Sequence, residues 1–128
     1  MASPPAGQPL LHYRGGVGQV AYLFHRVSGV AVWAFVVLHV VDIYLVGGDP
    51  ALYDELLSFY ASPVGRLLEV LLGAALMYHA LNGMRIIVMD LWPPLTRYHR
   101  QLWWISWALF LLIGIPVTWV IVKPIFGL

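Results

Sequence analysis

The stretch at residues 20–46 reads VAYLFHRVSGVAVWAFVVLHVVDIYLV, a nearly unbroken apolar run. A helix that crosses a bilayer needs about 20 mostly apolar residues, so this run predicts a transmembrane helix. Two further runs, at residues 64–91 and 102–122, meet the same requirement. Turn-forming sequences separate the three runs, with GGDP at residues 47–50 and WPP at residues 92–94. We therefore expect an all-α integral membrane protein with three transmembrane helices.

The composition of the chain agrees with a lipid environment. Of 128 residues, 61% are hydrophobic and only 10% are charged, against about 25% in soluble domains. No polar stretch is long enough for a separate soluble module, so residues 1–128 are expected to form one transmembrane domain. Residues 1–19 are expected to be a cytoplasmic N-terminal segment, and they lack the apolar core of a signal peptide. The net charge of +1 gives no reason to expect a nucleic-acid partner, and the absence of cysteine excludes disulfides and cysteine-bound iron–sulfur clusters within the chain.

The connection between the first two spans contains another helical signal. Asp49 is a suitable N-cap, and Pro50 suits the first helical position. The apolar residues that then fall on one helical stripe are Leu52, Leu56, Phe59 and Tyr60. This pattern predicts a short amphipathic helix lying in the membrane interface, with an irregular loop as the alternative.

The basic residues predict the orientation across the membrane. Five of the seven fall at one end of the expected bundle, namely Arg14, Arg26, Arg85, Arg97 and Arg100. Only Arg66 and Lys123 fall at the other end. Because basic residues gather on the cytoplasmic side, we predict a multi-pass protein of the inner (cytoplasmic) cell membrane whose N-terminus is cytoplasmic.

The third span has two further features. Its expected cytoplasmic entrance is rich in aromatic residues, as in an interfacial aromatic belt. These residues are Tyr98, Trp103, Trp104 and Trp107. Pro116 lies inside the span and is expected to kink the helix, which membranes tolerate when neighbours satisfy the freed backbone groups.

The most informative residues are polar side chains within the apolar spans, because ionisable groups at membrane depth usually face protein, a cofactor or water. His79 lies in the middle of the second span, and Ala75 and Gly83 lie one turn away on either side. Such small neighbours leave a flat slot in which a porphyrin could approach the imidazole, and haem iron accepts a neutral imidazole nitrogen. The same pattern also suits a buried histidine that is hydrogen-bonded to a neighbouring helix.

His39 lies in the first span at a different depth. It is about 27 Å from the expected cytoplasmic end near Ala21, whereas His79 is about 18 Å from the corresponding end near Leu91, at 1.5 Å per residue. The difference of about 9 Å disfavours one iron held between these two histidines. A haem at His79 would therefore take its second axial imidazole from another chain. His39 would either serve a second haem nearer the outer face or hydrogen-bond to a partner helix.

Polar residues at the start of the first span suit a quinone. Arg26 and Ser28 offer donors just inside the apolar boundary, and a quinone needs apolar surroundings with a few donors to its carbonyl oxygens. The simpler interpretation is that Arg26 extends to lipid headgroups or to a haem propionate. Arg85 and Asp90 would similarly form an interfacial contact and an ion pair between helices. No motif indicates independent catalysis, so the residues suit electron transfer in a membrane.

Two motifs resemble a known family. HRVSG at residues 25–29 is similar to the His-Arg-x-[Ser/Thr]-Gly signature of the cytochrome b membrane anchor of succinate dehydrogenase. YHALNGMR at residues 78–85, followed by Asp90, resembles the second family motif, which is a His, then Asn-Gly-x-Arg, then Asp. The resemblance extends over most of the chain, from His12 to Trp119.

The resemblance implies a role in succinate:quinone oxidoreductase (complex II). Such an anchor is not catalytic alone: it pairs with a second three-helix anchor subunit, and together they dock a flavoprotein subunit that oxidises succinate and an iron–sulfur subunit that passes electrons to menaquinone or ubiquinone. His79 is implied to be an axial ligand of haem b, opposite a histidine of the sister anchor. Arg26 is implied to help form the quinone site, and His25 and Arg85 are candidates for contacts with a haem propionate.

The sequence departs from the family pattern at two positions. Well-known members have a quinone-contacting Ser four residues before the motif Arg, and here Tyr22 stands in its place, with a phenol that could donate the same hydrogen bond. Many members with one haem have no histidine at position 39, whereas LHVVD at residues 38–42 looks like members with two haems.

Two other functions are compatible with the spans. One is a structural membrane anchor of a respiratory complex that holds no haem. The other is a small transporter or channel subunit, which would need polar residues along a path through all three helices. The third span offers only Ser106 and Thr118 for such a path.

Overall fold

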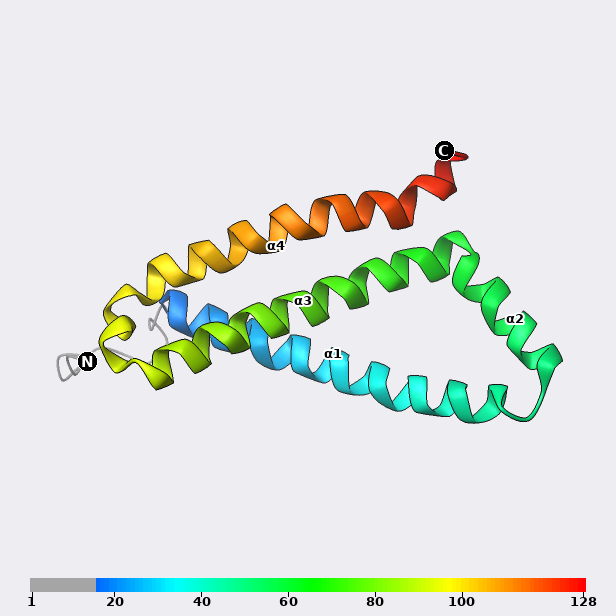
Figure 1. Ribbon diagram of the computed structural model, residues 1–128, viewed down its shortest axis with the longest axis horizontal. Coiled ribbons are helices and arrows are strands. Elements are labelled where there is room, and N and C mark those ends of the chain that lie inside the picture. The colour runs from blue at the N-terminus through cyan, green and yellow to red at the C-terminus, as the bar shows by residue number, and fades with distance from the viewer. Residues whose placement is uncertain (1–15) are drawn as a thin grey trace, which may run out of the picture.

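The computed structural model describes residues 16–128, and this part of the chain is helical with no strand (Figure 1). The helices are α1 (Val17–Val46), α2 (Pro50–Ala61), α3 (Pro63–Leu91) and α4 (His99–Val122), with the short 3-10 helices η2 (Pro93–Tyr98) and η3 (Lys123–Phe126) on either side of α4. The expected all-α fold is therefore confirmed. Three helical segments are long and apolar enough to cross a membrane, namely α1, α3 and the segment formed by η2, α4 and η3. Arg14 and most of the expected N-terminal segment lie outside the described residues.

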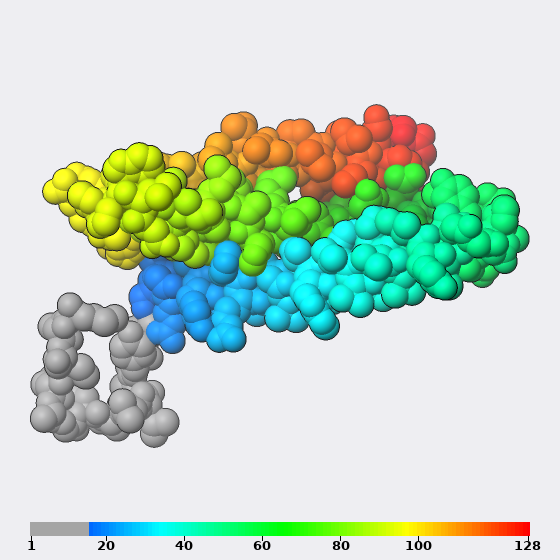
Figure 2. Space-filling view, turned by 60° about the horizontal axis from the view of Figure 1, so that its bottom comes forward, coloured from blue at the N-terminus to red at the C-terminus, as the bar shows by residue number. Residues whose placement is uncertain are grey.

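Helix α3 is the centre of the bundle. It packs extensively against both α1 and α4, which contact each other much less. The start of α1, the end of α3 and the start of α4 lie together at one end of the molecule (Figure 1). At the other end the ribbons of α1 and α3 diverge and α2 connects them (Figure 1), so that α2 forms this end of the molecule (Figure 2).

The predicted helix between the first two spans is present, and its start has the expected cap. The Asp49 side chain accepts a hydrogen bond from the backbone N–H of Ala51 at 2.9 Å, and Pro50 is the first helical residue. The Tyr60 hydroxyl donates a hydrogen bond to the Asp42 carboxylate and so ties α2 to α1. This hydrogen bond raises the pKa of the Tyr60 phenol, and burial and the neighbouring carboxylate act in the same direction. The location of α2 in a membrane interface stays a prediction.

The corner between α2 and α3 is held by hydrogen bonds between side chains and the backbone. Ser62 caps α3 by accepting from the Gly65 N–H at 3.1 Å. Arg66 donates to the Ala61 carbonyl and to the Ile121 carbonyl, both at 3.2 Å. One guanidinium thus satisfies carbonyl groups at the ends of both α2 and α4. Helix α4 itself continues without a break through Pro116.

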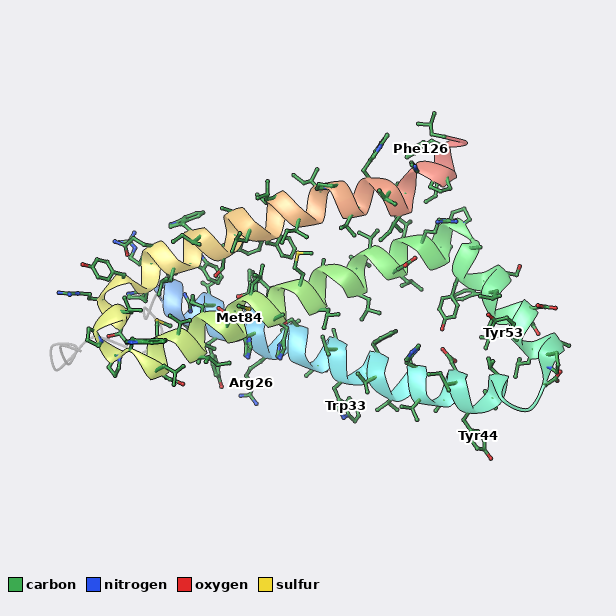
Figure 3. All side chains as sticks on the ribbon, viewed as in Figure 1. Arg26, Trp33, Tyr44, Tyr53, Met84 and Phe126 are labelled. Carbon is green, nitrogen blue, oxygen red and sulfur yellow. The ribbon has the colours of Figure 1, made fainter. Side chains whose placement is uncertain are left out.

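Few side chains in the described part of the chain are buried. The buried residues are Ala21, Ser28, Gly65, Tyr78, Asn82, Arg85 and Trp103. Most large apolar side chains face outward, including Trp33 and Tyr44, which point away from the other helices (Figure 3). An exposed apolar surface of this extent suits a chain surrounded by lipid and by other membrane helices.

An aromatic cluster forms the core at the junction of the three long helices. Trp103 packs edge-on against Tyr78 with ring centroids 6.1 Å apart, and Trp107 packs against both rings. The Tyr78 hydroxyl donates to the Ala21 carbonyl of α1 at 3.2 Å. Trp103 and Trp107 are four residues apart and share the helix face that packs on α3, so their rings face the core, while the interfacial aromatic belt stays a prediction.

Asn82 is the most deeply buried polar residue of this core. It is 2% exposed, and neither its amide nitrogen nor its amide oxygen has a hydrogen-bond partner among the described residues. Nearby, the Ser106 hydroxyl donates to the Leu102 carbonyl of its own helix at 2.9 Å. The interface between α3 and α4 therefore contains a buried amide without hydrogen-bond partners, which lowers the stability of this interface.

Gly65→Ala should destabilise the corner between α2 and α3. A Cβ at this position would lie 2.8 Å from Cα and O of Tyr60, and closer still to the Phe59 carbonyl oxygen. Overpacking of this kind costs about 1–3 kcal/mol. We expect a lower thermal midpoint for the protein in detergent. The control is Gly73→Ala in the same helix, where a Cβ would meet no atom within 4 Å. Equal midpoints for the two variants would contradict the close approach.

Asn82→Leu should stabilise the chain in detergent. The substitution roughly keeps the side-chain volume and removes two buried polar atoms without partners, each of which costs about 1–3 kcal/mol. Asn82→Ala is the control, since it removes the same atoms but leaves a cavity. We expect the thermal midpoint to rise for Leu and not for Ala. A lower midpoint for Asn82→Leu would mean that the amide has a partner in the folded protein.

Candidate functional site

The His79 side chain lies at the contact between α3 and α1. Its Nδ1 atom is 3.2 Å from the backbone carbonyl oxygen of His25 and 3.3 Å from the hydroxyl oxygen of Ser28. The Ser28 hydroxyl also donates to the same His25 carbonyl at 3.0 Å. One turn of α1 therefore surrounds one nitrogen of the His79 ring.

These contacts favour one position of the ring proton. A carbonyl oxygen can only accept a hydrogen bond, so the contact with the His25 carbonyl favours the tautomer in which the Nδ1 atom of His79 is the donor. In the neutral ring the lone pair then lies on Nε2. Within residues 16–128 the Nε2 atom makes no hydrogen bond. His79 thus has a ring nitrogen, Nε2, without a hydrogen-bond partner among the described residues.

Two neighbours fix the plane of the His79 ring. The His25 ring stacks on it, with centroids 4.1 Å apart and planes 9° from parallel. A Cβ at Gly29 would lie only 3.1 Å from Cε1 of His79, so the glycine allows the ring to approach α1 closely. A Cβ at Gly83 would lie 3.7 Å from Cε1 of His25. The space that the sequence predicted beside His79 is therefore occupied on the Gly83 side by the His25 ring.

Arg26 and Tyr22 form a separate pair on α1. The Arg26 Nη1 atom donates to the Tyr22 hydroxyl at 2.7 Å, and the guanidinium carbon lies 5.5 Å from the centre of the Tyr22 ring. Both side chains are exposed, and Arg26 points away from the bundle (Figure 3). Ser28 lies about 200° around the helix from Arg26 and faces His79 instead. The structure thus brings together two of the three residues that the sequence suggested for a quinone site.

His39 lies apart from this site. Its ring is exposed and stacks on Phe35, with centroids 5.2 Å apart. His39 is about 15 Å further along α1 than Gly29, which contacts His79. The two histidines are therefore too far apart to hold one iron from opposite sides, as the sequence indicated.

Arg85 is buried on a different side of α3. It is 8% exposed, its Nη1 atom donates to the His99 carbonyl at 3.2 Å, and its guanidinium lies 5.5 Å from the centre of the Trp103 ring. The Nε atom has no partner among the described residues. Arg85 thus packs against the start of α4, whereas the His79 ring faces α1.

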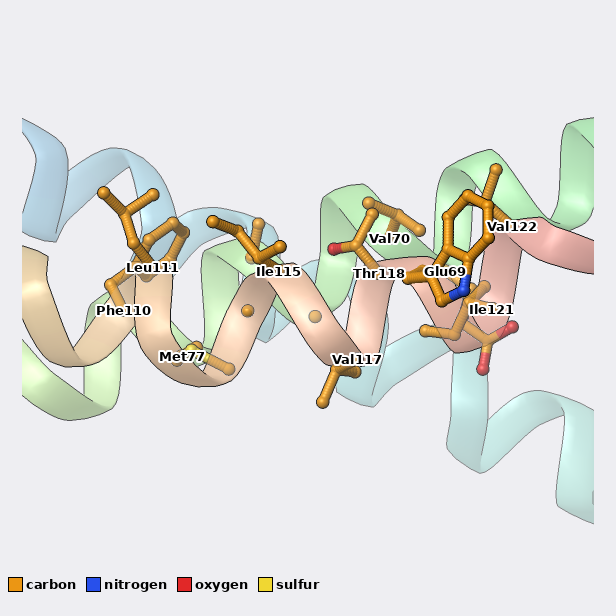
Figure 4. A pocket seen from close by; sticks show the side chains of 14 residues that line it. Glu69, Val70, Met77, Phe110, Leu111, Ile115, Val117, Thr118, Ile121 and Val122 are labelled. Atoms are coloured by element: carbon orange, nitrogen blue, oxygen red, sulfur yellow. The ribbon is translucent and has the colours of Figure 1, made fainter.

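A cavity of about 450 Å³ lies between α3 and α4, away from the His79 ring. Met77 and Phe110 lie at one end of it, and Glu69 and Val122 lie at the other (Figure 4). A smaller groove of about 230 Å³ is lined by Ser28 together with apolar and aromatic side chains of α1, α3 and α4. The first cavity includes none of the candidate haem- or quinone-binding residues.

The residues around His79 fit one axial position of a haem. The described residues contain no group of three His, Cys, Asp or Glu side chains that could hold a metal ion by themselves. Haem iron requires only one axial nitrogen from this chain when another chain supplies the second. The free Nε2 of His79 and its hydrogen-bonded Nδ1 match the usual arrangement of a metal-binding histidine.

The sequence did not identify Gly29 and the His25 carbonyl as neighbours of the His79 ring, although both residues lie in the motif HRVSG at residues 25–29. The available signal was the i, i+4 spacing of His25 and Gly29, which places them on one face of a helix. The spacing does not reveal that this face meets α3.

Comparison with known proteins gives two matches. Residues 4–117 match the family of succinate dehydrogenase/fumarate reductase transmembrane subunits. The chain is also 38% identical over 108 residues to the succinate dehydrogenase 2 membrane subunit SdhC of Mycobacterium tuberculosis strain H37Rv, covering 84% of this chain and 79% of the relative. The chain therefore belongs to the family of succinate dehydrogenase and fumarate reductase transmembrane subunits, as a multi-pass membrane-anchor subunit.

Proposed function

We propose that this anchor subunit binds haem b through the Nε2 atom of His79. The observation that carries the proposal is that Nδ1 is held by α1 while Nε2 has no partner among the described residues. A second three-helix anchor subunit would supply the opposite axial histidine. When bound, the haem supplies one-electron transfer within the membrane. The chain itself orients the plane of the imidazole and holds its Nδ1 atom against α1.

We further propose that Arg26 and Tyr22 bind a quinone, menaquinone or ubiquinone. The Arg26–Tyr22 pair presents a charge-assisted donor and a phenol on the exposed side of α1, next to apolar side chains. Both residues lie near the end of the molecule where Arg85, Arg97 and Arg100 also lie. By the positive-inside rule this end is cytoplasmic, together with the N-terminus. There the chain would dock the iron–sulfur and flavoprotein subunits that deliver electrons from succinate.

A second haem at His39 is part of the proposal. The exposed His39 ring lies on the second half of α1, three residues before Asp42, which bonds to Tyr60 of α2, and it is accessible to a partner chain. The alternative is that the anchor holds no haem and serves only to attach the soluble subunits to the membrane.

His79→Ala should remove haem from the assembled complex. We expect the reduced b-type absorption band and the haem-to-protein ratio to fall, because an axial ligand is lost. His39→Ala tests the second haem in the same assay. His99→Ala is the control, since this histidine lies at the start of α4 and contributes only its backbone to Arg85. Full haem content in the His79 variant would refute the assignment, and a wild-type complex without a b-type band would support the haem-free anchor.

Arg26→Leu should slow quinone reduction while leaving haem content unchanged. A hydrogen bond from a charged group contributes about 1.5–3 kcal/mol, so we expect a loss of about 10- to 100-fold in quinone reductase kcat/KM. Tyr22→Phe should give a smaller loss. Arg97→Leu is the control, because Arg97 is exposed at the same end of the molecule and its guanidinium lies on the Tyr98 ring. The assay compares succinate oxidation with quinone and with a soluble dye as acceptor. Equal effects on both acceptors would contradict a quinone site here.

A further inference from the structure

The hydroxyl of Ser28 has an unusual environment for a polar group in an apolar span. Ser28 is 6% exposed, and its hydroxyl already satisfies its donor by bonding to the His25 carbonyl three residues earlier. Serine in a helix often makes such a bond to its own helix and makes no other. Here the same oxygen also lies 3.3 Å from Nδ1 of His79 on another helix. Ser28 therefore joins α1 to α3 at the candidate ligand.

The bond within α1 fixes the direction of the Ser28 hydroxyl. Because the hydroxyl hydrogen points to the His25 carbonyl, the lone pairs of the oxygen are available to His79. The Nδ1–H of His79 then has two acceptors, the Ser28 oxygen and the His25 carbonyl. Both acceptors favour the tautomer with its lone pair on Nε2.

We propose that Ser28 is a positioning residue that orients the His79 ring and increases the electron density at its Nε2 atom. The inference rests on the proposed role of His79 as a haem ligand. An acceptor on Nδ1–H increases the electron density at Nε2 and orients the ring, as outer groups commonly do for metal-binding histidines. A nitrogen ligand that donates more electron density to the iron stabilises ferric over ferrous iron. Ser28 therefore lowers the reduction potential of a haem bound at His79. This role places Ser28 with the haem and apart from the quinone residues Arg26 and Tyr22.

The test compares Ser28→Ala with Ser28→Thr in the assembled complex. Loss of a group behind a metal-binding histidine typically weakens metal affinity about 10- to 100-fold, and we expect haem retention to fall by this factor in the Ala variant. The haem midpoint potential should rise and the low-spin ferric EPR spectrum should change. Threonine keeps the hydroxyl and should restore all three properties.

The matched control is Ser106→Ala. The Ser106 hydroxyl also bonds to a carbonyl of its own helix, Leu102 O at 2.9 Å, but contacts no histidine. We expect wild-type haem retention and potential in this variant. A Ser28→Ala complex with the potential and haem retention of the wild type would overturn the proposal, as would a Thr variant that behaves like Ala.

A second measurement does not depend on haem. In the full chain with 15N-labelled histidine, NMR reports which nitrogen of His79 is protonated. We expect the Nδ1–H tautomer in the wild type and in Ser28→Ala, because the His25 carbonyl remains as an acceptor, but with a shifted Nδ1 resonance in the variant, because one of the two acceptors is lost. An unchanged Nδ1 resonance would overturn the role of Ser28. A wild-type complex without haem would instead refute the proposed function, while the NMR result would still decide the contact between Ser28 and His79.

Discussion

The close approach of α1 and α3 at His79 is the constraint on which the site depends. Residue 29 of α1 has no side chain, and a Cβ there would lie 3.1 Å from the imidazole, so the ring would have to shift by a few tenths of an ångström. The same turn of α1 provides a backbone carbonyl and a hydroxyl to the nitrogen that faces it. Lipid offers no hydrogen bonds to a polar ring, so these partners must come from protein. Packing and hydrogen bonding therefore select the same position for the ring.

Much of the fold could be predicted from the sequence because its causes are local. The apolar runs predicted the three long helices. Asp49 followed by Pro50 predicted the start of α2, because an N-cap residue is adjacent in the chain to the helix that it begins. The depth difference between His39 and His79 also follows from the rise per residue, and the structure separates the two residues as expected.

The rotation of each helix about its axis could not be predicted. Arg26 and Ser28 are two residues apart in one motif, yet one faces outward and the other faces His79. Trp103 and Trp107 have the composition of an aromatic belt, but they pack on Tyr78 in the core. In a chain that is apolar on nearly every side, hydrophobicity does not mark the buried face. Only the contacts between helices decide which side chains meet.

The small core has a consequence for how cells handle this protein. Among the described residues, the buried apolar side chains are Ala21, Tyr78 and Trp103, while long stretches of α1 and α4 present Val, Leu, Ile and Trp outward. A copy made in excess of its companions would leave these faces, together with the polar pair Arg26 and Tyr22, in contact with lipid alone. Such an orphan protein is a natural substrate for membrane proteases, which would keep its amount matched to that of the assembly.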